Sequence, residues 1–152
     1  MARSLRLAIA GAALAAVALG TVATTAAGGP KVLDARLTGI PTGAPMLHGL
    51  TGGGVQWIID DGRAKLFADG RLEVDVQGLT LVNGVNPIDT GRAIVTCNSV
   101  AVARSGIVPF TDAGDALVAT RVDLPSPCLA PAVFFVGITP TGAERWFAVT
   151  GF

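Results

Sequence analysis

His48 is the only histidine of the chain, and its chemistry is considered first. It lies in Met46-Leu-His-Gly-Leu50, beside a glycine-rich stretch, where it could act as a general base or as a metal ligand. A triad mechanism also requires an activated serine, and Ser99, Ser105 and Ser126, the serines beyond residue 27, all lie outside a Gly-x-Ser-x-Gly motif. The sequence favours a loop or surface role for His48, and we assign no catalytic residue.

Four aspartates raise the question of acid–base or calcium chemistry. Hydrolysis of a sugar bond needs two carboxyl groups about 5–10 Å apart across a cleft, whereas Asp60 and Asp61 are neighbours whose side chains point to opposite faces of a strand. Calcium requires six to eight oxygen ligands, and the spacing of Asp112 and Asp115 around a glycine differs from that of a calcium-binding loop. Turn positions explain these residues, and we assign no metal ligand.

Tryptophan is the second residue type that could bind a ligand. Exposed Trp57 and Trp146 on one sheet face would form a platform for stacking sugars, whereas buried tryptophans would belong to the core. With only two Trp and no Tyr, burial is favoured. Gly52-Gly53-Gly54 lacks a following Gly-Lys-Ser/Thr and is not a phosphate loop, so we assign no cofactor. Trp57, Trp146 and His48 remain the candidate ligand contacts.

The two cysteines, Cys97 and Cys128, predict a single disulfide if the chain is exported. On the chain-entropy model, closing a loop of this size stabilises the fold by roughly 3–4 kcal/mol. The predicted bond joins a strand ending at Cys97 to a proline-rich loop at residues 125–131.

Residues 1–27 have the three parts of a cleaved signal peptide. Arg3 and Arg6 precede an uncharged run from Leu7 to Leu19, and small residues follow up to Ala27. The apolar run of about 13 residues is short against the roughly 20 that span a bilayer, which favours cleavage over a retained anchor. We therefore expect one secreted domain over residues 28–152, outside the cell or in its envelope, with no stable membrane anchor.

The charge of residues 28–152 argues against nucleic acid as a partner. The full chain has 11 basic and 11 acidic residues, so removal of Arg3 and Arg6 leaves a formal charge of −2 (11 − 2 basic against 11 acidic). Proteins that bind nucleic acid usually carry a clustered basic surface. A cell-envelope, glycan or protein partner remains open.

Alternation with a period of two dominates this part of the chain and predicts an all-β fold. Residues 71–77 alternate without error, and Asp69-Gly70 before them predicts a hairpin with a type I′ turn to a strand at 63–68. A second tight turn is expected at Asp61-Gly62. Residues 79–82 are expected to continue the 71–77 strand past a bulge at Gly78.

Further strands follow from similar runs of apolar and β-branched residues, and loops from runs of Gly and Pro. The other expected strands are 32–38, 55–60, 92–97, 115–124, 133–138 and 145–150, with 133–138 central. The expected loops are 39–54, 83–91 and 125–131. The sequence therefore predicts an antiparallel β-sandwich or flattened barrel of eight or nine short strands, with no helix of useful length.

Several segments resemble an uncharacterised family of small exported proteins of high-GC Gram-positive bacteria. They are residues 123–131, residues 146–152, Gly78-Leu-Thr-Leu-Val, and Asn86-Pro before Cys97. The resemblance covers most of residues 28–152. It implies an extracytoplasmic β-domain and assigns no catalytic residue to any position.

The leading functional hypothesis is a non-catalytic extracellular β-domain that acts through structure or ligand binding. An uncovered sheet edge or clustered exposed aromatics would favour binding over a passive role. Two alternatives are a small secreted hydrolase that uses His48 with a distant aspartate, and a calcium-stabilised adhesion module.

Overall fold

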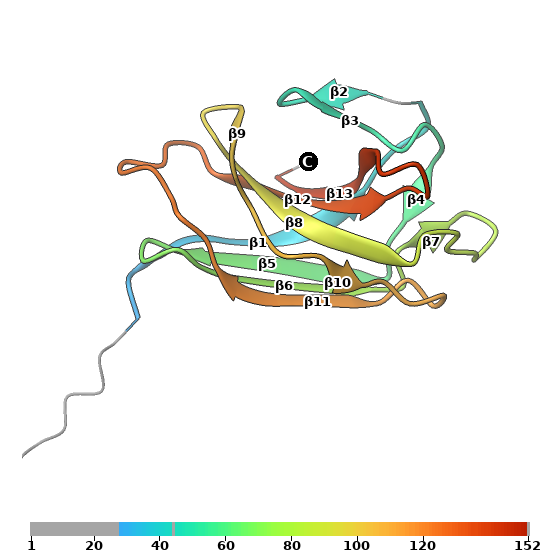
Figure 1. Cartoon of the computed structure of the whole chain (residues 1–152), viewed down its shortest axis with the longest axis horizontal. Coiled ribbons are helices and arrows are strands. Elements are labelled where there is room, and N and C mark those ends of the chain that lie inside the picture. The colour runs from blue at the N-terminus through green and yellow to red at the C-terminus, as the bar shows by residue number, and fades with distance from the viewer. Residues whose placement is uncertain (1–27, 44, 152) are drawn as a thin grey trace, which may run out of the picture.

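The computed structural model describes residues 28–43 and 45–151 and shows an antiparallel all-β fold (Figure 1). Within these residues there are thirteen strands and no helix. A helix long and apolar enough to cross a membrane is accordingly not found among them. The predicted signal peptide, residues 1–27, lies outside the described residues.

The strands form two layers and two short ladders. The first layer contains β1 (Lys31–Gly39), β5 (Asp61–Phe67), β6 (Arg71–Gln77) and β11 (Ala116–Arg121). The second layer contains β8 (Thr90–Cys97), β9 (Val100–Arg104), β10 (Val108–Pro109), β12 (Ala132–Ile138) and β13 (Glu144–Thr150). The short ladders pair β2 (Met46–Leu47) with β3 (Leu50–Thr51), and β4 (Trp57–Ile58) with β7 (Thr80–Leu81).

Strand β1 joins the two layers into one curled sheet. Its residues Lys31 to Arg36 pair with β5, and its residues Leu37 to Gly39 pair with β13. The resulting strand order is β10-β8-β12-β13-β1-β5-β6-β11, with β9 also paired to β8. The predicted flattened antiparallel fold is confirmed, and its two ends are β11 in the first layer and β9 with β10 in the second.

The space between the layers is filled by the buried side of the alternating pattern. Leu72, Val74 and Val76 of β6 are at most 1% exposed, while their sequence neighbours face outward. An aromatic cluster completes the interior, in which Trp57 stacks on Phe147 with ring centroids 3.9 Å apart. A strand with one buried face needs this regular alternation, because a shift of one residue would turn its apolar side chains to water.

The outer face of the second layer is also apolar, and the β2–β3 hairpin covers it in Figure 1. Phe134 and Trp146 point to this face and are almost fully buried. The indole Nε1 of Trp146 donates a hydrogen bond of 3.2 Å to the Pro45 carbonyl oxygen, and Gly53 N donates one of 3.1 Å to the Trp146 carbonyl. The hairpin therefore forms a second, smaller core with β12 and β13.

The hairpin between β5 and β6 is confirmed, but its predicted turn type is wrong. Leu66 pairs with Leu72, and Gly70 N donates a hydrogen bond of 2.9 Å to the Phe67 carbonyl. Of the central pair, only Gly70 has a positive φ, +84°, as in a three-residue loop that ends in a left-handed glycine. A Cβ at Gly70 would also collide with the Val122 carbonyl oxygen.

The second tight turn expected at Asp61-Gly62 is also wrong, because both residues belong to β5. Gly62 pairs with Val76, and a Cβ there would lie 2.5 Å from Ile59 Cδ1. The glycine permits close packing rather than a turn. Only Trp57 and Ile58 of the strand expected at 55–60 have strand pairing.

The segment after β6 leaves its strand instead of extending it. Gly78 has a φ of +64°, and the following residues form β7, which pairs with β4. The loop expected at 39–54 contains the β2–β3 hairpin, whose turn residues His48 and Gly49 have φ values of +51° and +74°. The β2–β3 hairpin was not predicted because each of its strands has only two residues. Strands β4 and β7 lie within the strands expected at 55–60 and 79–82, but their pairing with each other was not predicted.

The disulfide between Cys97 and Cys128 is present, and it connects the segments that the sequence indicated. Cys97 ends β8 in the second layer, and Cys128 lies in the loop that returns from β11 to β12. Asn98 N also donates a hydrogen bond of 2.6 Å to the Leu129 carbonyl. The bond therefore fixes the connection between the two layers against the end of β8.

Candidate functional site

His48 occupies the tip of the β2–β3 hairpin, and its ring is turned toward the sheet. Its Nδ1 lies 2.8 Å from the hydroxyl oxygen of Thr96, and its ring meets Phe134 edge-on with centroids 5.4 Å apart. Thr96 is fully buried on β8. This geometry gives His48 a role in holding the hairpin over the second layer.

The two tryptophans do not share a pocket with His48. Trp146 lies on the same outer face as His48, with Phe134 between them. Trp57 stacks on Phe147, the next residue of β13, which points to the opposite side of the strand. Both tryptophans are buried, at 3% and 1% exposure, so neither offers a ring to a ligand from solvent.

The aspartates considered for calcium occupy different environments. Asp61 faces outward and pairs with Arg36 at 3.7 Å, whereas Asp115 Oδ1 accepts a hydrogen bond of 2.9 Å from Gly78 N. Asp112 lies in an exposed turn closed by a 2.8 Å hydrogen bond from Gly114 N to the Thr111 carbonyl. Across residues 28–43 and 45–151, no three His, Cys, Asp or Glu side chains are grouped as a metal site.

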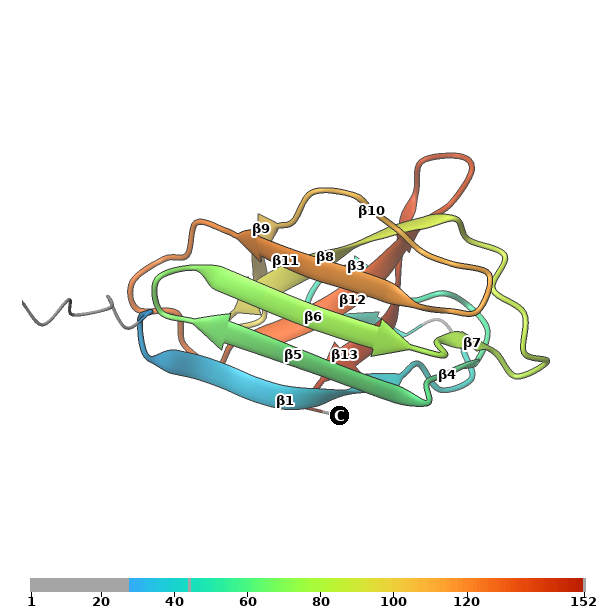
Figure 2. The same ribbon diagram turned by 90° about the horizontal axis from the view of Figure 1, so that it is seen from below.

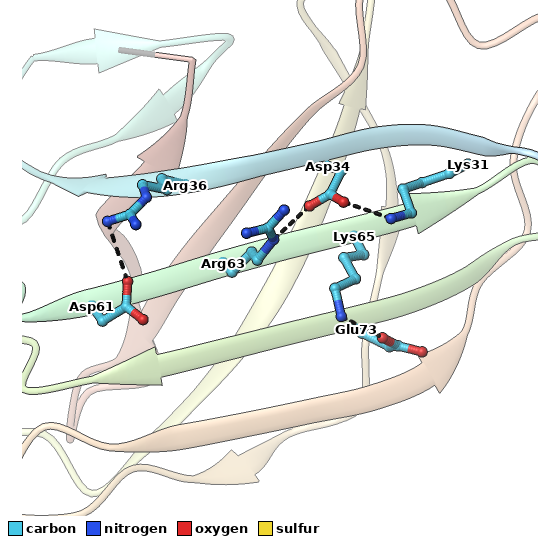
Figure 3. A network of polar contacts seen from close by, with 7 residues as sticks. All are labelled: Lys31, Asp34, Arg36, Asp61, Arg63, Lys65 and Glu73. Atoms are coloured by element: carbon cyan, nitrogen blue, oxygen red, sulfur yellow. Dashed lines mark hydrogen bonds and ion pairs between the residues drawn. The ribbon is translucent and has the colours of Figure 1, made fainter.

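The outer face of the first layer carries a network of charges, drawn in Figure 3. Asp34 lies between Arg63 Nε at 2.6 Å and Lys31 Nζ at 2.5 Å. Lys65 lies 3.5 Å from Glu73 on the neighbouring strand. These charges largely satisfy one another, so the centre of this face is a solvated surface rather than a charged binding site.

Asp34 gives this face a measurable pH dependence. Hydrogen bonds from Arg63 and then Lys31 hold the pKa of the Asp34 carboxyl well below its usual 3.8. A carboxylate with a lowered folded pKa stabilises the protein above its unfolded pKa, and this stabilisation is lost as the pH falls through the folded value. We expect Asp34→Asn to unfold at a lower temperature than the wild type at neutral pH, with the difference shrinking below about pH 4. Thermal melts of both proteins from neutral pH to below about pH 4 measure this difference. A difference in unfolding temperature that stays constant with pH would contradict the prediction.

Strand β11 is the last strand of the first layer, and one of its edges lies away from β6. Val122 N donates a hydrogen bond of 2.9 Å to the Gly70 carbonyl, in register with the β11–β6 ladder. In an antiparallel pair, the backbone N–H and C=O groups of successive residues point alternately toward the partner strand and away from it. Since those of Val122 point toward β6, those of the odd-numbered residues of β11 point away from β6. The contact of Asp115 is consistent with this alternation, because its carbonyl oxygen accepts a hydrogen bond of 3.0 Å from Thr111 N on the side away from β6. Within residues 28–43 and 45–151, the outward N–H and C=O groups of Leu117, Ala119 and Arg121 are therefore free of backbone partners.

At the other end of the sheet, β9 and β10 carry features that oppose pairing with a further strand. Strand β10 has only two residues and ends in Pro109, and β9 is irregular where it pairs with Val95 and Thr96. Short strands, proline and bulges are common protections of sheet edges. By contrast, β11 pairs with β6 over six residues in an unbroken register, and its first charged residue is Arg121.

Strand β11 lies beside the β10 segment in Figure 2, and a groove runs between residues of these two segments. It has a volume of about 180 Å³ and is bounded by residues 105–108 on one side and 118–120 on the other. Ile107, which is 56% exposed, lines the groove, whereas the side chain of Leu117, 65% exposed, lies on the outer face of the first layer. The edge therefore combines free backbone groups, which can bond an added strand, with a largely apolar groove that can accept its side chains.

The sequence indicated the β11 strand but not its position in the sheet. Alternation over 115–124 places Ala116 and Val118 on the buried face, and both are buried. Whether the strand is central or at an edge depends on strand order, which alternation does not encode. A residue such as Leu117, apolar on the outward side of an otherwise alternating strand, is the one local signal.

Comparisons with protein-family models, curated proteins and solved structures found no match.

Proposed function

We propose that the chain is an exported, non-catalytic binding protein that acts in the cell envelope or outside the cell. Its binding site is the open edge of β11, where an extended segment of a partner polypeptide adds to the first layer as a further strand. The observation that carries the proposal is the row of free backbone groups at Leu117, Ala119 and Arg121 beside an apolar groove.

Strand addition fits this edge better than the other candidate sites fit a ligand. Trp57 and Trp146 are buried, and His48 is engaged with Thr96 and Phe134. At the edge, main-chain hydrogen bonds supply affinity and side-chain contacts supply selectivity. The disulfide is compatible with the oxidising compartments in which exported proteins reside.

A titration with a synthetic peptide of alternating Thr and Val tests the proposal, with amide chemical shifts as the readout. We expect shifts concentrated at Leu117, Ala119 and Arg121, with a Kd of about 10 µM–1 mM, because one short strand buries little surface. Leu117→Lys introduces a charge of the kind that protects natural edges, and we expect it to weaken binding about tenfold.

Leu129→Lys is the matched control, because Leu129 is 61% exposed and lies on the loop beside the disulfide. It should bind the peptide as the wild type does. Shifts that avoid β11, or equal binding by both lysine variants, would refute the assignment of the site.

A further inference from the structure

We infer that the strand captured by β11 is selected by charge and side-chain size. This inference rests on the proposed function. The partner is an extended segment that runs antiparallel to β11, with an acidic residue opposite Arg121 and small apolar residues at the two positions facing the groove. An apolar residue lies opposite Leu117.

The length of the free edge limits the segment to about five residues in contact. At one end, Thr111 already occupies the place beside Asp115, with hydrogen bonds of 3.0 Å in both directions. At the other end, Arg121 is the last residue of the strand. The three outward-facing residues between these limits pair with the first, third and fifth residues of an antiparallel segment.

Arg121 supplies the charge that selects the first residue. Its Nη2 lies 3.3 Å from Asp69 Oδ2 and its Nη1 donates a hydrogen bond of 2.9 Å to the Asp69 carbonyl oxygen, yet 66% of its side chain stays exposed beside the free edge. A residue directly opposite in an antiparallel pair has its Cβ about 4.5–5.5 Å away, and opposite charges stabilise such a pair. An acidic residue is therefore favoured at this position and a basic residue is disfavoured.

The groove selects the second and fourth residues of the segment. In a strand added beside β11 these side chains point to the same side as Val118 and Thr120. They would enter the space of about 180 Å³ that Ile107 and Val108 bound from the second layer. Its apolar walls favour a side chain such as valine, because an unpaired polar group buried there costs free energy. The fifth residue lies opposite Leu117, whose side chain is 65% exposed on the outer face of the layer. An apolar side chain at this position would cover part of the Leu117 surface that is otherwise in water.

Two synthetic peptides that differ only in charge test this inference. They contain Asp-Val-Thr-Val-Leu and Lys-Val-Thr-Val-Leu between identical polar flanks, and binding is measured from the amide shifts of Ala119 and Leu117. We expect the acidic peptide to bind the wild type about five- to tenfold more tightly. Arg121→Glu should reverse the preference, whereas Arg36→Glu, a change at a more exposed arginine (81%) on the same layer, should leave it unchanged.

The outcomes separate the inference from the proposed function. If both peptides bind at β11 with equal affinity, or if Arg121→Glu leaves the preference unchanged, strand capture stands and the charge selection is overturned. If neither peptide binds at millimolar concentration, strand capture itself fails. Sedimentation of the protein without peptide tests whether a second copy of the chain occupies the edge instead. Self-association that Leu117→Lys abolishes would show that it does and would overturn the inference.

Discussion

Replacing Trp146 by alanine is expected to lower the free energy of unfolding by about 3–5 kcal/mol, as for other large aromatic side chains removed from a core. Trp146 is 1% exposed and packs edge-on against Phe134, with ring centroids 5.8 Å apart. The substitution removes this packing and the hydrogen bond to Pro45, and it leaves a cavity under the β2–β3 hairpin. Urea unfolding followed by far-UV circular dichroism measures the change.

Trp146→Phe separates packing from hydrogen bonding. A phenyl ring keeps most of the buried area but cannot donate to the Pro45 carbonyl, so we expect a loss of about 1–2 kcal/mol. If Trp146→Ala costs less than about 1 kcal/mol, the hairpin does not form a second core, and Trp146 becomes available to a ligand again.

Removing the disulfide should have an effect of similar size. The double variant Cys97→Ala/Cys128→Ala opens a loop with a sequence separation of 31, and the chain-entropy model gives a loss of about 4 kcal/mol. Alanine avoids placing a hydroxyl at the buried end of β8, where Cys97 is 6% exposed. Against a total stability of about 5–15 kcal/mol for a domain, this loss is large.

The slope of the denaturant curve provides a second readout for the disulfide. Without the bond the unfolded chain is less compact, so more surface is exposed on unfolding and the m-value rises. Wild-type protein unfolded with a thiol reductant should match the double variant in midpoint and slope. An unchanged midpoint in both would mean that the bond does not constrain the unfolded chain.

Local patterns were sufficient to predict most of the long strands that form the two layers. Residues 71–77 lie in a strand whose regular alternation specifies its buried face. Residues 92–97 and 133–138 also lie in strands, and their runs of apolar and β-branched residues indicated these strands because both faces are largely buried. The β9 strand was missed because the turn before it contains no glycine. Asn98 and Ser99 both have positive φ, +51° and +63°, in a two-residue hairpin turn of the kind expected instead at Asp69-Gly70.

The candidate site depends on contacts that are remote in sequence. The groove beside β11 forms only because the second layer brings residues 105–108 to β11. Local patterns fix which side of a strand is apolar but not which strands become neighbours, since that order follows from the packing of the whole domain. The burial of Trp57 and Trp146 also results from this packing, through β13 and the β2–β3 hairpin.

Amide hydrogen exchange in the unbound protein tests the central claim most directly, because it reports which backbone groups of β11 are paired. The account predicts rapid exchange at Leu117, Ala119 and Arg121 and slow exchange at Val118 and Thr120, whose N–H groups point to β6. Similar protection at all five amides would contradict it, since the edge would then already be occupied or covered, and strand addition at β11 would be excluded.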